Sequence, residues 1–520
     1  MRHCSRSSLT YFGIGVAAAI LCMIYFRGTQ TNIDAIEVLN IHTMSKPVIT
    51  VGSGLAGLSA AHEALKAGAR VHMLDRAPKP GGNSIKASSG INGAGTRFQK
   101  DKNITDDSGR FFEDSTRSAG ARLLQSHEQE RKALIEILTS QSADAVDWLA
   151  DEIGVDLTTV AQLGGHSVAR THRGSSGPPP GAAIVSALLK KLGADPRFTL
   201  TSSADVEALT VGDDGAVSGV RYTVAGGETR EAHGPVVFAA GGFAGDANGL
   251  LAKHRPDLAG MPSTNDARPA PHGLLSDLGA AFVDMDSVQI HPTGFVDPKD
   301  PKATYKFLAA EALRGEGGIL LSREGRRFVN EMERRDVASD AIMALPRWSS
   351  GDEDEDDVRQ WDVTLLLDPG ACEAAGSHLG FYVFKGLMQK KKVRDLPPAV
   401  IAAVDRYAAA VAAGADDEFG RKTFGHWRLP PGEANREEEV AVGTVTPVTH
   451  FTMGGVAFNT KAQVLGQKGG GLAPIQGVWA AGEITGGIHG DNRLGGSSLL
   501  ECAVFGRIAG AEAAKSLAGA

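Results

Sequence analysis

Three glycines in the pattern G-x-G-x-x-G, Gly52, Gly54 and Gly57, lie between a short apolar stretch and a helical pattern. In such a turn the first glycine allows the bend, the second lets the backbone approach a pyrophosphate, and the third lets the helix pack on the strand. The pyrophosphate then lies at a helix N-terminus. Asp75 ends the next apolar stretch, where a carboxylate can bind ribose hydroxyls. The spacing therefore predicts a dinucleotide-binding site.

A second glycine-rich strand end near the C-terminus, Ala480-Ala-Gly482-Glu483, favours FAD over NAD as the dinucleotide. A late strand of this kind brings the chain back to the flavin in flavoproteins, and the small polar residues between Gly81 and Asn92 suit the ribityl chain and the ring edge. We expect cofactor contacts from Gly52, Ser53, Gly54, Ala56, Gly57, Asp75, Arg76, Asn83, Ser84, Ser88, Ser89, Gly90, Ile91, Asn92, Val206, Ala240, Gly241, Asp277, Gly482, Glu483, Ser498 and Leu499.

The elements that must position these residues can be read from the hydrophobic pattern. Val48–Val51 predicts a strand, residues 58–67 a helix and residues 69–74 a second strand, which is the Rossmann order. Residues 105–155 show helical spacing, whereas residues 199–240 alternate as strands do. The chain returns to a strand at Val478 and to a helix at Ser498.

We therefore predict an α/β fold: a discontinuous Rossmann-type FAD-binding domain with an inserted α+β capping domain. The FAD-binding domain takes residues 46–293 and 448–520, and the capping, substrate-clamping domain takes residues 294–447. Residues 1–45 form a separate N-terminal segment.

Composition excludes several classes of protein. The net charge is −8, with six consecutive acidic residues from Asp352 to Asp357, which we interpret as a solvated loop. No basic surface typical of nucleic-acid binding is indicated. The four cysteines, Cys4, Cys22, Cys372 and Cys502, show no CxxC spacing, so neither a metal site nor a covalent haem that could feed electrons to a flavin is expected.

The N-terminal segment contains sixteen uncharged residues, Tyr11 to Phe26, with Arg2 and Arg6 before them and Arg27 after them. As a helix this stretch is about 24 Å long, short of a bilayer core of about 30 Å. One interpretation is a single-pass anchor in the endoplasmic reticulum or another endomembrane, with the enzyme domain lumenal and the segment in contact with the membrane. A mitochondrial presequence and a cleaved signal peptide are the alternatives.

The chain resembles the flavoprotein family of fumarate reductases and succinate dehydrogenases, most nearly its soluble, haem-free eukaryotic fumarate reductases. The likeness runs from about residue 46 to residue 515 and rests on long motifs in the family's order: VGSGLAGL, GGNSIKASSGING, LGGHSVARTHR, QIHPTGF, EALRGEGGILL, GRRFVNE, VTPVTHFTMGG, AAGEITGGIHG and NRLGGSSLLE. It implies transfer of a hydride from flavin N5 to fumarate and protonation of the other alkene carbon, giving succinate.

The resemblance also implies roles for particular residues. The substrate-binding residues are His291, His450 and Arg493, with His450 and Arg493 at one carboxylate and His291 at the other. The proton donor is Arg335, resupplied through Arg314 and Glu311. Ser84 stands where membrane-complex members attach FAD through a histidine, which implies non-covalent FAD.

Two positions depart from the family's pattern. Ala310 stands where many members have a threonine that contacts a substrate carboxylate. Asp491 precedes the NRLGG motif, and its negative charge near a pocket for a dianion is unfavourable unless it points away or is paired with a neighbouring cation.

Two other functions stay open at this stage. One is a different flavin reaction, either reduction of another activated alkene such as a urocanate- or acrylate-like carboxylate or dehydrogenation of a steroid. The other is a flavin-binding electron-transfer partner without a substrate of its own. The set formed by His291, Arg335, His450 and Arg493 argues against the second function, because a pure electron carrier needs none of these residues. The electron donor could be a reduced flavin, NADH or a thiol oxidase.

Overall fold

A mostly parallel sheet carries the glycine-rich turn. The computed structural model describes residues 46–125, 127–348 and 358–518. In it β1 (Val48–Val51) pairs in parallel with β2 (Val71–Asp75) and with β10 (Val236–Phe238). The sheet order is β19-β20-β10-β1-β2-β6, in which β19 runs antiparallel to β20. The edge strands are β6 (Phe198–Ser202) and β19 (Gln463–Lys468), and β20 (Gly471–Ala480) lies between β19 and β10.

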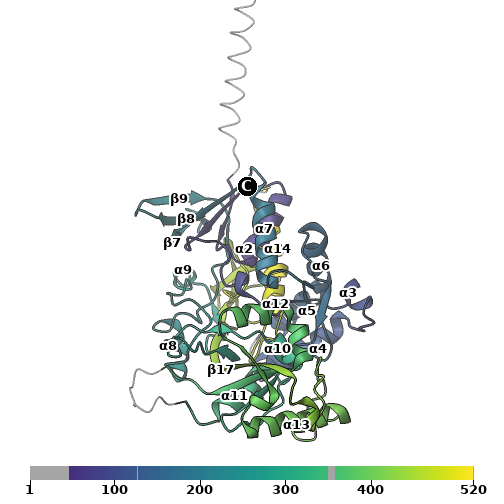
Figure 1. Cartoon of the computed structure of the whole chain (residues 1–520). Helices are drawn as coiled ribbons and strands as arrows, with labels where there is room; N and C mark the ends of the chain where they lie inside the picture. Colours follow the sequence, from purple (N-terminus) through teal and green to yellow (C-terminus); the bar gives the residue numbers. More distant parts are fainter. Residues whose placement is uncertain (1–45, 126, 349–357, 519–520) are drawn as a thin grey trace, which may run out of the picture. The chain divides into compact units, whose positions relative to one another are not determined.

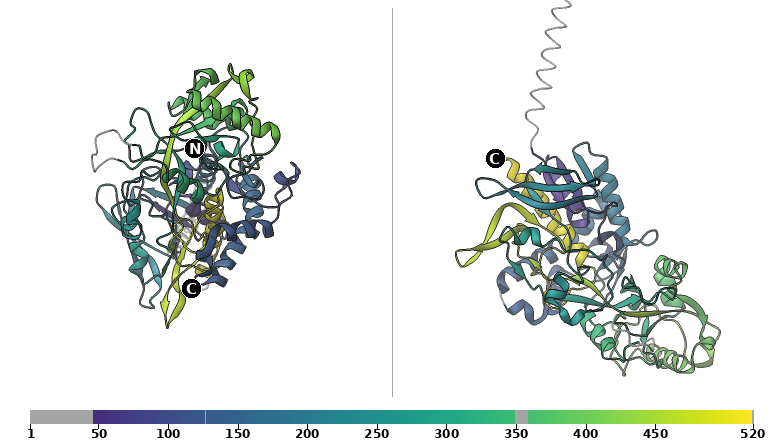
Figure 2. Two further views of the ribbon diagram at one scale, coloured as in Figure 1. Left: turned by 90° about the horizontal axis from the view of Figure 1, so that it is seen from below. Right: turned by 90° about the vertical axis from the view of Figure 1, so that its left-hand side faces the viewer.

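Both faces of this sheet are covered, because alternate residues of its strands are apolar on both sides. Val48 and Val237 pack with residues of the helices α2 (Leu55–Lys66), α7 (Pro180–Gly193) and α14 (Ser497–Ala518). These three helices lie side by side in Figure 1, and the views in Figure 2 agree. Ile49 and Phe238 point to the other face.

The other face packs on a three-stranded meander of β7 (Ala204–Val211), β8 (Val217–Val224) and β9 (Thr229–His233). The helical expectation for residues 105–155 is met by α4 (Ser108–Ala119), α5 (Glu128–Ser140) and α6 (Ser142–Asp147). The predicted α/β class and Rossmann-type cofactor fold are confirmed.

Two glycines of the turn cannot be replaced without steric conflict. Gly52 has a φ of 104°, and a Cβ added there would lie 2.3 Å from the carbonyl oxygen of Ala239, the residue after β10. A Cβ at Gly57 would lie 1.9 Å from the carbonyl oxygen of Gly52. The motif therefore joins β1 to α2 by backbone contact, as its spacing predicts.

A second sheet contributes the strands that hold the other predicted site residues. Its order is β13-β12-β17-β15-β14, and the long strand β17 (Glu439–Thr452) pairs antiparallel with β12 (Val288–Phe295). Its remaining strands are β13 (Phe307–Leu308), β14 (Ile319–Leu321) and β15 (Val363–Leu367), and the strand β16 (Gln389–Lys392) also pairs with β17.

Helices α10 (Ala312–Gly315), α11 (Arg335–Met343), α12 (Pro369–Phe384) and α13 (Pro398–Ala413) accompany this sheet and lie with β17 in the lower part of Figure 1. The predicted domain boundaries at residues 293 and 447 fall inside β12 and β17, so both strands continue past them. The division into domains stays a prediction.

The prediction of an endomembrane anchor requires correction. Within residues 46–125, 127–348 and 358–518 no helix is both long and apolar enough to cross a membrane. The segment on which the anchor was predicted, residues 1–45, lies outside the described residues, as do Cys4, Cys22 and the acidic run from Asp352 to Asp357. The single-pass anchor with a lumenal enzyme domain is therefore withdrawn.

Candidate active site

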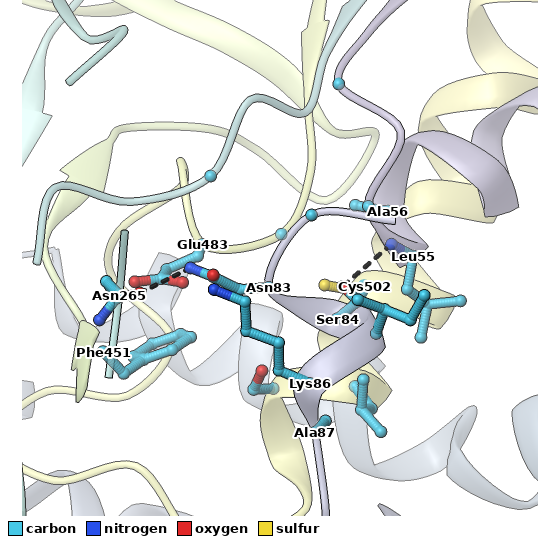
Figure 3. Close-up of a pocket in the computed structure, with 18 of the residues that line it drawn as sticks. Leu55, Ala56, Asn83, Ser84, Lys86, Ala87, Asn265, Phe451, Glu483 and Cys502 are labelled. Atoms are coloured by element: carbon cyan, nitrogen blue, oxygen red, sulfur yellow. Dashed lines mark hydrogen bonds between the residues drawn. The ribbon is translucent and has the colours of Figure 1, made fainter. Parts of the chain in front are cut away.

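A deep pocket opens at the carboxyl ends of the parallel strands, where ligands bind in α/β sheets of this kind. Its cavity volume is about 410 Å³. The turn after β1, the segment after β2, the ends of β10 and β20, and the start of α14 all contribute to its wall. Figure 3 shows Glu483, Asn265 and Phe451 on one side of the pocket and Leu55, Ala56 and Cys502 on the other.

The structure brings most of the predicted cofactor contacts together around this pocket. The lining includes Gly52, Ser53, Gly54, Ala56, Asp75, Arg76, Asn83, Ser84, Ser88, Ser89, Gly90, Val206, Ala240, Gly241, Gly482, Glu483, Ser498 and Leu499.

Four predicted contacts do not line it. Gly57 lies behind the turn, and Ile91 is buried in the core. The side chain of Asn92 donates to the carbonyl oxygen of Gly495 and to Ser497 Oγ. Asp277 is exposed at the end of the short helix α9 (Gly273–Ser276).

The pocket wall fits a dinucleotide. A Cβ at Gly82 would lie 3.4 Å from the Cα of Gly54, so two backbone segments approach each other closely at the N-terminus of α2. The hydroxyl of Ser88 is buried and has no hydrogen-bond partner in the described part of the chain. Asp75 accepts from the backbone N–H of Ser53 at 2.7 Å and from its hydroxyl, which fixes the turn beside the carboxylate.

Asn83 and Ser84 begin the next segment of the wall. The side-chain nitrogen of Asn83 donates to Asn265 Oδ1 at 2.6 Å, and Ser84 Oγ accepts from the backbone N–H of Leu55 at 3.0 Å. Figure 3 marks both bonds. The hydroxyl of Ser84 thus provides a hydrogen-bond acceptor for the backbone N–H of the first residue of α2.

The predicted proton donor and its relay form a buried cluster at one end of the pocket. Arg335, the first residue of α11, donates from Nε at 2.7 Å to Oε2 of Glu311, and its Nη2 lies 2.6 Å from the same oxygen. Nη1 of Arg335 donates to Oε1 of Gln289 at 2.6 Å. The backbone N–H of Gly164 donates to the other oxygen of Glu311. Both charged side chains are almost wholly buried, whereas Arg335 still borders the pocket.

Arg314 lies behind Glu311, one helical turn along the chain. Its Nη2 lies 3.7 Å from Oε1 of Glu311, and its Nη1 donates to the backbone carbonyl of Glu331 at 2.6 Å. Nε and Nη2 have no hydrogen-bond partner among the described residues. Burial opposes ionisation of Glu311, but the charges of Arg335 and Arg314 outweigh it and lower the pKa of this carboxyl. Glu311 is therefore an ionised bridge between two guanidinium groups.

The three predicted substrate ligands lie close to this cluster. Arg493 and His450 line the pocket, and the imidazole of His291 lies beside that of His450, with 5.2 Å between ring centroids. Arg493 lies over the ring of Phe451, with Cζ 4.2 Å from its centroid. Antiparallel pairing of β12 with β17 explains the histidine pair, since each histidine belongs to one of these strands.

Both histidines are neutral at physiological pH. Burial, followed by the charges of nearby arginines, holds the pKa of His291 and of His450 well below the usual value. Nδ1 of His291 lies 3.2 Å from both the backbone nitrogen and the carbonyl oxygen of Thr293, contacts that suit either neutral tautomer, and the other ring nitrogen is Nε2. That nitrogen is buried and has no partner in the parts of the chain that the structure describes.

The two departures from the family's pattern have defined surroundings. Asp491 Oδ1 accepts from Nε of Arg122 at 3.1 Å, and Oδ2 accepts from the backbone N–H of the same residue. The negative charge of Asp491 is therefore paired with Arg122. Asp491 does not line the pocket. The backbone N–H of Ala310 donates to the hydroxyl of Tyr382, and that hydroxyl donates to the carbonyl oxygen of Leu308.

Sequence reasoning missed Gln289, which joins the proton-donor cluster to the substrate ligands. Its Nε2 donates to the carbonyl oxygen of Arg493 at 2.7 Å while its Oε1 accepts from Arg335. The signal was present, because Gln289 stands two residues before His291 and alternate residues of a strand share one face. Phe451, under the guanidinium of Arg493, gave no comparable signal.

Comparisons with known proteins identify relatives of this chain. The family described as FAD binding domain matches residues 47–499. The chain is 40% identical over 487 residues to a fumarate reductase of Schizosaccharomyces pombe, covering 90% of this chain and 89% of that protein. It is 42% identical over 486 residues to fumarate reductase 1 of Saccharomyces cerevisiae, covering 89% and 97%.

Among solved structures, the open conformation of a flavocytochrome c3 fumarate reductase matches with a TM-score of 0.68 and 31% identity, over 93% of this chain and 81% of that one. The predicted family and the FAD cofactor are thus confirmed. The chain belongs to the FAD-binding flavoprotein family that contains these fumarate reductases.

Proposed function

We propose that this chain reduces fumarate to succinate with electrons from its bound FAD. The observation that carries the proposal is the charge of the cluster at the end of the cofactor pocket. Three guanidinium groups, those of Arg335, Arg314 and Arg493, lie around the carboxylate of Glu311 and give the cluster an excess of positive charge, which Glu483 and Glu501 reduce at Arg493. Because His291 and His450 are neutral, this charge complements a small dianion such as fumarate.

Binding uses both ends of the dianion. Arg493 and His450 hold one carboxylate, with bidentate contact available to the guanidinium. In the neutral tautomer with its proton on Nε2, His291 donates to the other. A buried donor without a partner costs about 1 to 3 kcal/mol, and a substrate carboxylate relieves that cost when it accepts from His291.

The reduced cofactor supplies a hydride to one alkene carbon when it is bound. Charge that develops on the substrate is stabilised by the fixed cations of Arg335 and Arg493. Arg335 gives a proton to the second alkene carbon, and Glu311, held within 2.7 Å of it, returns one from Arg314. A guanidinium titrates above about 12 in water, so this transfer depends on the strong basicity of the carbanion-like centre.

We propose an electron donor outside the chain: a reduced flavin, NADH or a thiol oxidase. The sequence has no CxxC pair for a covalent haem, so an internal chain of haems is not part of the proposal. Stopped-flow mixing of the oxidised protein with each donor identifies the one that bleaches the flavin absorbance fastest.

The function is tested by reoxidation of the dithionite-reduced protein without oxygen. We expect fumarate to restore the oxidised flavin spectrum and to yield one succinate per flavin. Crotonate, which has one carboxylate, and urocanate, which carries an imidazole in place of the second carboxylate, serve as controls. If either reoxidises the flavin faster than fumarate, the chain reduces a different activated alkene. If no alkene does so, it is an electron-transfer protein.

A further inference from the structure

Tyr382 of α12 brings a phenol hydroxyl to the wall of the pocket. Its side chain lines the pocket although it is almost wholly buried. The hydroxyl oxygen accepts from the backbone N–H of Ala310 at 3.2 Å, and the O–H donates to the carbonyl oxygen of Leu308 at 2.9 Å. Neither the predicted cofactor contacts nor the proton transfer uses this hydroxyl.

Three consecutive residues, 309 to 311, connect Tyr382 to the predicted substrate site. The carbonyl oxygen of the first accepts from Thr293 Oγ at 3.1 Å, and the same Oγ lies 3.3 Å from Nδ1 of His291. The second donates its N–H to Tyr382, and the third carries the carboxylate that pairs with Arg335. The hydroxyl therefore lies at the same end of the pocket as His291 and Arg335.

This end of the pocket has few hydrogen-bond donors for the second carboxylate of a dianion. An ionised carboxylate offers about four lone-pair sites. His291 is neutral and provides at most one donor, and the side chain of Ala310 provides none. At the other carboxylate the guanidinium of Arg493 offers two charged donors. A second neutral donor beside His291 would therefore complete the site.

Tyr382 has the properties that such a donor requires. Burial raises the pKa of its hydroxyl to about 12, so the oxygen keeps its proton throughout the neutral range. The N–H of Ala310 polarises the oxygen, which makes the O–H a stronger donor. An ionised carboxylate is also a stronger acceptor than the carbonyl group of Leu308, so the O–H turns to a carboxylate that comes within reach.

We propose that the hydroxyl of Tyr382 donates to the second carboxylate of the substrate, next to His291, and so makes the pocket select a dicarboxylate. The inference rests on the proposed function, because it names a further residue of the same substrate site. A monocarboxylate held by Arg493 and His450 leaves the hydroxyl of Tyr382 on Leu308 and gains nothing from it.

The test is equilibrium binding of fumarate and of crotonate to the oxidised holoprotein, followed by the change in flavin absorbance without turnover. Tyr382→Phe removes one hydroxyl and keeps the ring that packs on Phe295, with 4.6 Å between ring centroids. We expect the Kd for fumarate to rise about tenfold to a hundredfold, the usual loss for a hydrogen bond to a charged group. The Kd for crotonate should stay close to the wild-type value.

Tyr407 provides a matched control. It lies on α13, it is buried and does not line the pocket, and its hydroxyl has no hydrogen-bond partner among the described residues. Tyr407→Phe should bind both ligands as the wild type does. Thermal melting and the flavin spectrum confirm that both variants fold and hold FAD.

A second measurement uses the wild-type protein alone. The chain has six tyrosines, and labelling them with ring-deuterated tyrosine identifies their bands in infrared difference spectra. Fumarate should shift the C–O band of one tyrosine, because its O–H exchanges a carbonyl acceptor for a carboxylate. Crotonate should leave that band in place.

Three results overturn the inference. The first is a Tyr382→Phe variant that binds fumarate as the wild type does. The second is an equal rise in Kd for both ligands, because the hydroxyl then only supports the backbone of residues 308–310. The third is a tyrosine band that shifts equally with both ligands. A wild-type protein that binds neither ligand, or binds crotonate as tightly as fumarate, instead refutes the proposed function.

Discussion

Nε and Nη2 of Arg335 both contact a single oxygen of Glu311, at 2.7 and 2.6 Å, in an ion pair that is almost closed to solvent. The two residues belong to different elements, with Glu311 just before α10 and Arg335 at the start of α11. The pair fixes the guanidinium in one orientation at the pocket wall. In the proton transfer that we propose, Glu311 is the neighbour of Arg335 that would return the proton to it.

Replacement of Arg335 by alanine should leave FAD bound, because the predicted cofactor contacts lie on other segments. Substrate binding should weaken moderately, since His291, His450 and Arg493 remain. Turnover should fall by at least about 10²-fold, within the usual range for loss of a general acid. Lysine at this position should recover little, because it lacks the fixed fork of the guanidinium. The measurement is fumarate-dependent reoxidation of the reduced protein.

Arg334 offers a matched control for that experiment. It precedes Arg335 and pairs with Asp336 at 2.7 Å on the partly exposed side of the same helix start. Arg334→Ala should keep turnover near the wild-type rate. If Arg335→Ala keeps more than about a tenth of the wild-type rate with FAD bound, it is not the proton donor.

The pH dependence of kcat/KM should be set by Arg493. Burial, followed by the charge of Arg335, lowers the pKa of this guanidinium to about 9. The charged form binds substrate, so kcat/KM should fall as the pH rises through about 9. His291 and His450 titrate well below the usual range, so no step should appear between pH 6 and 7. Initial rates at saturating FAD measure this, and a descending limb near pH 7 would contradict it.

The purified protein should be yellow, and acid precipitation should release all of its flavin as FAD. Ser84 stands where covalent members of the family have a histidine, and its hydroxyl is occupied by the N–H of Leu55. Chromatography of the supernatant identifies the flavin. Flavin that remains with the precipitate would disprove non-covalent attachment.

Replacement of Asp491 by asparagine should change fumarate affinity by less than about threefold. The carboxylate is paired with Arg122 and does not line the pocket. Because the pair is partly exposed, its loss should cost about 0 to 1 kcal/mol of folding stability. Isothermal titration and a thermal melt check both values. A large gain in affinity for fumarate would mean that the charge of Asp491 reaches the substrate.

The residues that line the cofactor pocket could be predicted largely from the sequence, because the glycine motif and the strand before it are recognised from short stretches of chain. Gly57 is required by its close contact with the backbone of Gly52, a few residues earlier. Gly52 is required by its close contact with Ala239, next to the neighbouring strand. The predicted strand Val48–Val51 has the same bounds in the structure. Asp277, also expected to contact the cofactor, does not line the pocket, because nothing local determines on which side of a short helix an exposed carboxylate lies.

The substrate half depends on contacts between distant segments. The roles of Glu311 and Arg335 came from resemblance, since a sequence alone does not reveal that two residues in separate elements share one hydrogen bond. The spacing of Gln289 to His291 indicates a shared face, but not its partners, Arg335 and Arg493, which are far from it along the chain. The predicted boundary at residue 447 falls within β17 because a change in composition does not mark where a strand ends.

The place of β20 in the central sheet has a consequence for biosynthesis. This strand pairs with β10, and α14 packs against α2, so the last segments of the chain complete a sheet that the first segments begin. A ribosome-bound chain that ends before Gly471 has the glycine turn but neither Glu483 nor the start of α14. FAD can therefore contact all of its predicted binding residues only when synthesis of the chain is almost finished.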